Sequence, residues 1–289
     1  MADTLQLVLS GLALGGIYAL IAVGFVTVFK VCGLINFAQG DFATVGALSL
    51  AMFFAIGLPT WLALLGAIVV AAIVGGVLHR VFLDRLRDQA ETVQIIATIG
   101  LSIVLQSVGQ LLMGSQPRAV PPFLPGQPYH LMGGAVPRQD VVILVAVAVL
   151  FVLLYFFFEK SYAGAALRAV MLNRDSARLL GISARSMATF SFIIGASVAG
   201  LGGAVIAPVT LVSYDMGLTL GLKGFVAAVV GGLSDVPGAV AGAFILGLLE
   251  SVGAGFVSSA YKEAIAFVVL IVILLWRPNG LFGKSADRV

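Results

Sequence analysis

Long apolar stretches follow one another along almost the whole of this chain, with only short polar segments between them. A stretch of about 20 apolar residues can cross a bilayer as an α-helix. Of the 289 residues, 61% are hydrophobic and 10% are charged, whereas about a quarter of the residues of a soluble domain are charged. A bilayer must therefore surround most of the chain. The sequence predicts an all-α polytopic membrane protein with one domain over residues 1–289 and nine spans: 5–29, 34–56, 59–79, 92–114, 139–158, 187–210, 217–233, 236–257 and 261–276.

The basic residues predict the orientation, because cytoplasmic loops of membrane proteins carry an excess of Lys and Arg. Five of the sixteen basic residues lie in 159–186, and placing that segment in the cytoplasm leaves twelve inside and three outside. Alternation of the spans then puts the N-terminus outside and the C-terminus in the cytoplasm. The charges form no stripe with interleaved aromatic residues, so no nucleic-acid partner is expected.

The segment Glu159–Ser186 is too polar to cross a bilayer and has the pattern of two short helices. Ser161 and Asn173 are residue types that cap helix N-termini, and Gly181 is a type that ends helices. The first helix is expected to run to about Leu172. Its apolar face continues into the second helix through Leu167, Val170, Met171, Leu179 and Leu180, with the arginines projecting elsewhere. We interpret the segment as a helical elbow that meets a soluble partner; the alternative is a basic loop that only fixes topology.

The predicted outer segment 115–139 contains six of the ten prolines, which stiffen a chain without regular hydrogen bonding. It is either a shaped cap that receives a partner or guards an entrance, or an ordered connector.

A faint repeat relates Gly33–Phe37 to Gly221–Phe225, with three identical residues in five. In the predicted topology the two segments enter the membrane from opposite sides. Inverted repeats of this kind build many transporters, with the substrate route at their interface. Chance similarity is the alternative in so apolar a chain.

Polar residues gather at the start of the second span. Asn36, Gln39 and Gly40 lie at helical i, i+3, i+4 spacing beside Phe37, and the amides could bond to a solute or to another helix. Asp41 is expected about 10 Å below the surface. A carboxylate at that depth needs water, a partner or a proton. The alternatives are a lining of a substrate route and contacts that only join helices.

Two charges are expected inside the membrane, Lys223 in the seventh span and Glu250 in the eighth. Both lie about 10 Å from the outer surface in antiparallel neighbouring spans. We expect them to pair, because an unpaired charge at depth is costly; each reaching the outer interface separately is the alternative.

In the fourth span, Ser102, Gln106 and Gln110 recur every four residues. This spacing fits a polar lining or a helix–helix seam.

Known catalytic arrangements are missing from the sequence. The tail Gly280–Ser285 ends like a P-loop, but the first glycine of that motif is replaced by Pro278. The chain has two histidines and one cysteine, and it shows no metal-ligand cluster or nucleophile–base pair. We therefore expect no enzymatic activity, no metal site and no cofactor on this chain. Energy for uphill transport would come from another subunit or an ion gradient.

Four stretches resemble one known family: Gly33–Asp41, Gly164–Ile182, Gly221–Gly242 and Arg277–Gly283. They are similar, in the same order over the whole chain, to the permease of the branched-chain amino acid ABC importer, most closely its H-type subunit. The resemblance implies an ATP-binding-cassette importer in a bacterial inner membrane. It also implies a heterodimer with an M-type permease, two cytoplasmic ATPase subunits that hold ATP and Mg²⁺, and an external solute-binding protein.

The resemblance implies that the elbow is the segment that docks on an ATPase. The residues expected to couple it are Gly164, Leu167, Arg168, Asn173, Arg174, Arg178, Leu180 and Gly181. The family often has an acidic residue where this chain has Asn173, which leaves the polarity of that contact open. The second, seventh and eighth spans are expected to form walls of the substrate route. The residues expected along it are Asn36, Phe37, Gln39, Gly40, Asp41, Ser102, Gln106, Lys223 and Glu250.

Other functions stay open at this level. Importers of urea, short amides or aromatic acids share the same motifs, so the expected solute is a branched-chain or other hydrophobic amino acid with these as alternatives. A passive channel or a gradient-driven carrier is the second alternative. An intramembrane enzyme is disfavoured by the missing catalytic residues.

Overall fold

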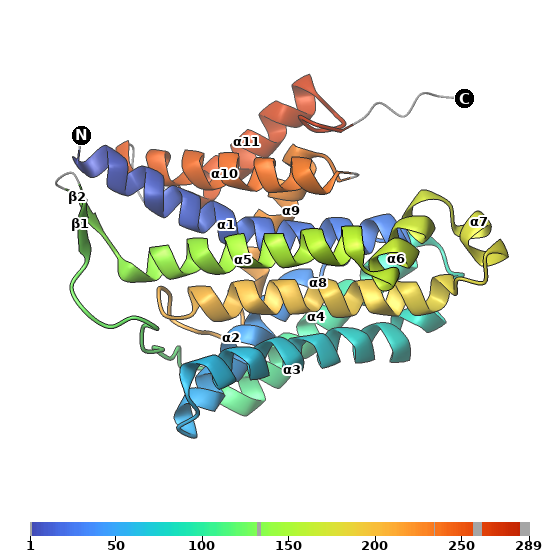
Figure 1. The fold of residues 1–289 in the computed structure, drawn as a ribbon, viewed down its shortest axis with the longest axis horizontal. Helices are drawn as coiled ribbons and strands as arrows, with labels where there is room; N and C mark the ends of the chain where they lie inside the picture. Colours follow the sequence, from blue (N-terminus) through green and yellow to red (C-terminus); the bar gives the residue numbers. More distant parts are fainter. Residues whose placement is uncertain (1, 132–133, 234, 257–261, 284–289) are drawn as a thin grey trace.

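The computed structural model describes residues 2–131, 134–233, 235–256 and 262–283. The described chain is mainly helical, as predicted, with one short hairpin of strands β1 (Tyr129–Leu131) and β2 (Gly134–Val136) (Figure 1). The helices are α1 (Ala2–Cys32), α2 (Gln39–Ala55), α3 (Thr60–Val81), η1 (Leu83–Arg85), α4 (Glu91–Met113), α5 (Arg138–Lys160), α6 (Tyr162–Leu172), α7 (Arg174–Leu179), α8 (Ala184–Ile206), α9 (Met216–Gly231), α10 (Val236–Phe256) and α11 (Lys262–Trp276).

An apolar helix occupies each of the nine predicted spans, but the helices differ in length. Among the described residues, six are long and apolar enough to cross a membrane, namely α1, α3, α4, α5, α8 and α10. Helices α2, α9 and α11 have 17, 16 and 15 residues. The chain is therefore a polytopic helical membrane protein, while the count of nine spans stays a prediction.

Helices α1 and α8 form the centre of the bundle. Most of the apolar length of each is buried, whereas α3, α4 and α5 turn most of theirs outward. Small residues allow close contact: an added Cβ at Gly15 of α1 would lie 2.8 Å from the Cα of Phe244 in α10, and one at Gly247 would lie 2.5 Å from the Cα of Gly15. Glycine-lined seams of this kind join membrane helices, where apolar packing against lipid gives no preference for association.

The bundle has two distinct ends (Figure 1). We call the end with α6 and α7 the elbow end and the end with β1 and β2 the hairpin end. The described N-terminus lies at the hairpin end. The segment after α11 lies beside the last turn of α9, where the Leu281 backbone N–H donates to the Val230 carbonyl (2.8 Å). The side of the membrane that each end faces stays a prediction.

The structure corrects the predicted start of the second span. Gly33 has φ of +69°, and residues 34–38 are not helical, so the helix begins only at Gln39. Asn36 and Phe37 therefore precede the helix, and Asn36 does not share a helical face with Gln39. The faint repeat does not mark equivalent positions either, because Gly33–Phe37 is irregular while Gly221–Phe225 lies inside α9.

The predicted elbow is confirmed in its local structure. The Ser161 hydroxyl accepts from the Gly164 backbone N–H (2.9 Å) and caps α6, which ends at Leu172. The Asn173 side chain accepts from the N–H groups of Asp175 and Ser176 and caps α7. The chain then turns at Gly181 with φ of +80°, a conformation that a glycine adopts without a steric penalty.

Candidate functional site

A cavity of about 230 Å³ lies between α1, α4, α9 and the irregular segment before α2. Its lining is mainly apolar and includes three phenylalanines from three different segments of the fold. The Phe225 ring lies 5.7 Å from the Phe25 ring and 5.8 Å from the Phe37 ring, measured between centroids. Ser102 is a polar residue in this lining. The cavity thus combines an aromatic wall with a hydroxyl group.

Hydrogen bonds fix the irregular segment that brings Phe37 to the cavity. The Phe37 N–H donates to Thr98 Oγ1 of α4 (3.2 Å). The Asn36 side-chain oxygen accepts from the Ala38 N–H (3.2 Å), and its carbonyl accepts from the Gln39 N–H (3.0 Å). An Asn side chain that bonds to the backbone two residues later stabilises a turn in place of a helix. This turn is the physical reason for the late start of α2.

Gly40 allows α2 to approach α9 closely. A Cβ at position 40 would lie 2.5 Å from the Cα of Gly221, and it would also overlap the Gly217 carbonyl oxygen. The backbone of α9 therefore fills the space beside this glycine. Because Gly221 also lines the cavity, this contact sets the position of one cavity wall.

Asp41 is buried in the first turn of α2 and forms a polar chain with α4. Gln106 Nε2 donates to Asp41 Oδ1 and to Ser102 Oγ, both at 3.1 Å. In the described part of the chain, no cationic nitrogen lies within 4.0 Å of this carboxylate. Gln110, the next residue of the predicted stripe, is exposed and donates to Ser115 (3.0 Å). The stripe thus covers Ser102 and Gln106 and stops there.

Gln39 is also buried, but it faces α8. Its Nε2 donates to the Gly195 carbonyl (2.9 Å), which joins α2 to α8. Its Oε1 and the Asn36 Nδ2 are among the buried polar atoms of the described residues that have no protein partner. A buried polar atom without a partner costs free energy, so these two amides retain unused binding capacity at the start of α2.

The predicted Lys223–Glu250 ion pair is present, with 2.6 Å between Nζ and Oε1. The Tyr18 hydroxyl donates to Glu250 Oε2 (2.8 Å), and Lys262 Nζ lies 3.6 Å from Oε1. On α9 the cavity is lined by Leu218, Gly221, Leu222 and Phe225, whereas residue 223 points about 140° away from residue 218 at 100° per residue. The geometry therefore favours a structural role for the pair, joining α1, α9 and α10. Its predicted place in the substrate route is not supported by the position of the cavity.

The root of the elbow is packed against the bundle. Leu167 is fully buried and shares a cluster with Val31 at the end of α1. A Cβ at Gly164 would lie 2.8 Å from the Cα of Phe158, so α6 folds closely back on α5. Arg168 pairs with Glu159 across this turn (2.6 Å), and Arg174 donates to the Val31 carbonyl.

The tip of the elbow exposes large apolar side chains. Leu179 and Leu180 are 89% and 78% exposed, and Leu172 is similarly exposed. Leu179 and Leu180 therefore do not continue the apolar face of α6, which corrects the prediction from the sequence. The turn at Asn173 breaks the helical phase, so the buried face of α7 is formed by Ala177. The elbow thus packs against the bundle at its root and exposes large apolar side chains at its tip, a feature of surfaces that contact another protein or a membrane.

Several contributors to these sites have weak sequence signals. Tyr18 has the sequence pattern of an ordinary packing residue in an apolar span, and Phe25 has no distinguishing neighbours. Phe225 lies in a stretch with a recognisable sequence, but that sequence does not indicate its partners. Thr98 appears only as one of several polar residues in its span. Their roles depend on contacts between helices that are distant in sequence, such as Tyr18 with Glu250. No single-helix pattern indicates such contacts.

Comparison with known proteins identifies a family. The family described as "branched-chain amino acid transport system / permease component" matches residues 7–274. The chain is 32% identical over 294 residues to the high-affinity branched-chain amino acid transport system permease protein LivH of Escherichia coli, covering 97% of this chain and 96% of LivH. It is 32% identical over 299 residues to the corresponding protein BraD of Pseudomonas aeruginosa, with the same coverage.

The fold also resembles a solved structure, PsaBC from Streptococcus pneumoniae in complex with Fab. The TM-score is 0.52 at 13% identity, and the alignment covers 93% of this chain and 90% of that chain. At this identity the likeness concerns the fold alone. The match over residues 7–274 and the 32% identity along nearly the full length together show that this chain belongs to the family of branched-chain amino acid transport system permease components.

Proposed function

We propose that this chain is the H-type permease subunit of an ATP-binding-cassette importer that carries branched-chain or other hydrophobic amino acids into the cytoplasm. The observation that carries the proposal is the 32% identity to LivH over 97% of the chain. The chain itself contributes the passage, and ATP hydrolysis takes place on partner subunits that hold ATP and Mg²⁺.

The cavity between α1, α4 and α9 supports this class of solute. Sites for small molecules are mainly apolar with a few placed polar groups. Here the rings of Phe25, Phe37 and Phe225 provide an apolar surface for a hydrocarbon side chain. Ser102 lines the cavity, and Gln106 links its hydroxyl to the Asp41 carboxylate behind it. In the proposal, the aromatic wall receives the amino acid side chain, and this polar chain interacts with its charged ammonium group.

Membership of the family supports a set of partners. We propose a heterodimer with an M-type permease, two ATPases at the elbow end and a solute-binding protein at the hairpin end, in the inner membrane of a bacterium. The elbow end then faces the cytoplasm, with the N-terminus outside and the C-terminus inside. The exposed leucines of the elbow contact an ATPase, while Arg174 and the buried Leu167 connect the elbow to α1.

Reconstitution tests the transport function. The four subunits are purified as a complex, placed in liposomes that contain ATP, and given the solute-binding protein with radiolabelled leucine, urea or phenylacetate outside. We expect ATP-dependent uptake of leucine with little uptake of the other two solutes. Uptake of urea or phenylacetate in preference to leucine would refute the proposed solute class. Leucine uptake that persists without ATP and collapses with an uncoupler would refute the importer class.

Accessibility of the elbow tests the orientation. Ser176 at the elbow end and Ser115 at the hairpin end are both exposed. In a Cys32→Ser background, a membrane-impermeant maleimide should label Ser176→Cys only in inside-out vesicles and Ser115→Cys only in right-side-out vesicles. The reverse pattern would refute the orientation.

A further inference from the structure

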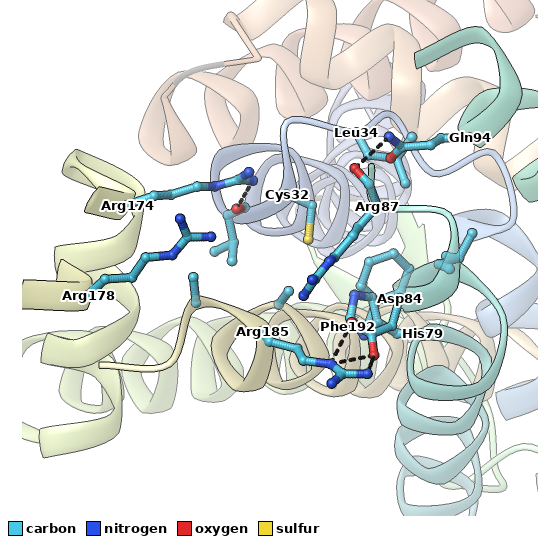
Figure 2. Close-up of a pocket in the computed structure, with 14 residues that line it drawn as sticks. Cys32, Leu34, His79, Asp84, Arg87, Gln94, Arg174, Arg178, Arg185 and Phe192 are labelled. Atoms are coloured by element: carbon cyan, nitrogen blue, oxygen red, sulfur yellow. Dashed lines mark hydrogen bonds and ion pairs between the residues drawn. The ribbon is translucent and has the colours of Figure 1, made fainter. Parts of the chain in front are cut away.

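A second cavity, of about 100 Å³, lies at the elbow end and is distinct from the aromatic cavity. It is enclosed by the end of α1, the segment between α3 and α4, helix α7 and the start of α8. Figure 2 shows four arginines entering it from three of these segments: Arg87, Arg174, Arg178 and Arg185. Asp84 is the acidic residue in the lining, which leaves an excess of three positive charges.

Two of the arginines already have protein partners within this cluster. Arg185 Nε lies 2.9 Å and 2.6 Å from the two oxygens of Asp84, a buried carboxylate whose charge it neutralises. Arg174 donates to the neutral carbonyl of Val31. These contacts leave the charge of Arg174 without a counterion within 4.0 Å in the described chain.

The other two arginines have only weak surface partners. Arg87 lies 3.2 Å from Asp88 and Arg178 lies 3.2 Å from Asp175, and these two acids are 85% and 89% exposed. Exposed pairs of this kind contribute little free energy, because water screens them. In Figure 2 the guanidinium groups of Arg87 and Arg178 are directed into the same space. Both are therefore available to an anion.

We propose that this cavity binds a phosphate group, and that in the membrane the group belongs to an anionic phospholipid. Guanidinium groups form paired hydrogen bonds with phosphate oxygens, and basic pockets between helices at the cytoplasmic surface bind lipid headgroups. The exposed Val81 and Phe82 precede the lining residue Leu83 and give the acyl chains an apolar surface beside the site. The assignment to the cytoplasmic leaflet relies on the proposed function.

The bound group would join the elbow to the rest of the bundle. Arg178 belongs to α7, whereas Arg87 belongs to the segment between η1 and α4. A phosphate contacted by both links the docking elbow to the helices on the far side of the cavity. The lipid is thus expected to affect coupling between ATP hydrolysis and transport, beyond any general effect on membrane insertion.

The test compares two double variants of the importer complex in nanodiscs of phosphatidylcholine with a minor fraction of phosphatidylglycerol. Arg87→Gln with Arg178→Gln removes two charges from the cavity. Arg85→Gln with Lys160→Gln removes two exposed charges at the same end, neither of which lines the cavity. Native mass spectrometry counts the phosphatidylglycerol retained, and titration with inorganic phosphate measures its displacement. Leucine uptake in parallel liposomes reports on the proposed function separately.

We expect about tenfold weaker retention of phosphatidylglycerol in the cavity variant, as for the net loss of one charge-assisted hydrogen bond, and no change in the control. Displacement by inorganic phosphate in the wild type, but not in the cavity variant, would support the phosphate site with a free anion as its natural occupant. Equal retention by both variants would overturn the proposal. Release of the lipid when the ATPases bind, with cross-links from Arg178→Cys to an ATPase, would also overturn it in favour of a protein carboxylate. Absence of leucine uptake by the wild-type complex, together with the expected weaker lipid retention in the cavity variant, would count against the proposed function alone.

Discussion

Replacing Glu250 is expected to destabilise the protein more than replacing Lys223, its partner in the buried ion pair. Glu250 contacts Lys223 at 2.6 Å and Tyr18 at 2.8 Å, with Lys262 at 3.6 Å. At an effective dielectric constant of about 20, two unit charges attract by roughly 6 kcal/mol at 2.6 Å and roughly 5 kcal/mol at 3.6 Å. A glutamate that has lost Lys223 therefore keeps a second cation, although Lys262 is partly exposed and screened. Among the described residues, Lys223 has no second acid within 4.0 Å.

We therefore expect Glu250→Gln to lower the free energy of unfolding by about 3–5 kcal/mol, the range for a buried pair that loses one partner. Lys223→Met should lower it by about 1–2 kcal/mol, because Tyr18 and Lys262 still satisfy the carboxylate. Unfolding in mixed detergent and SDS micelles gives both values. Lys262→Met should be nearly neutral alone and costly when combined with Lys223→Met, because it then removes the last cation near Glu250.

The difference in stability between Glu250→Gln and Lys223→Met is the part of this prediction that can be refuted. Equal losses in the two single variants, or a larger loss for Lys223→Met, would show that Lys262 does not compensate. In a Lys262→Met background, which removes the second cation beside position 250, the exchanged variant Lys223→Glu with Glu250→Lys should recover stability and leucine uptake relative to either reversed single variant. Failure to recover either quantity would mean that the surrounding contacts, and not the pairing of opposite charges, hold these residues.

Two further variants test the region between α2, α4 and α9. Gly40→Ala should destabilise the protein by about 1–3 kcal/mol, because the new methyl group would lie 2.5 Å from the Cα of Gly221. The control is Gly100→Ala, whose methyl group meets open space. Similar melting temperatures of the two variants would contradict the close contact. Gln106→Leu should cost about 1–3 kcal/mol, because a buried carboxylate loses its donor. The exposed Gln110→Leu should stay within about 0.5 kcal/mol of the wild type, and thermal melting that does not separate the two would count against the polar chain.

The parts of the structure that follow from the sequence are those with local causes. Ser161 and Asn173 cap the elbow helices as predicted, because a cap needs only a side-chain oxygen and the amides two or three residues later. The Lys223–Glu250 pair was also predictable, since an apolar environment leaves a charged group few alternatives to a partner of opposite sign.

The features that could not be predicted depend on competition between a turn and a helix, or on contacts between residues that are distant in the sequence. The start of α2 was predicted about five residues too early, because the apolar run through Leu34 and Ile35 gives no sign that the Asn36 turn prevails over helix formation. The aromatic wall joins Phe25 to Phe225 across 200 residues of sequence. The pattern of a single span reports that a residue is apolar, but it does not report which neighbour it meets.

The hydrogen bond from Arg174 to the Val31 carbonyl connects the elbow directly to the end of α1. Helix α1 is continuous from Val31 back to Phe25, a distance of about 9 Å at 1.5 Å per residue. An α-helix bends very little over so short a length, so a displacement of Val31 also displaces Phe25. If an ATPase displaces the elbow by a few ångströms, we therefore expect one wall of the aromatic cavity to move with it. Helix α1 alone would transmit this movement, without successive changes of side-chain contacts.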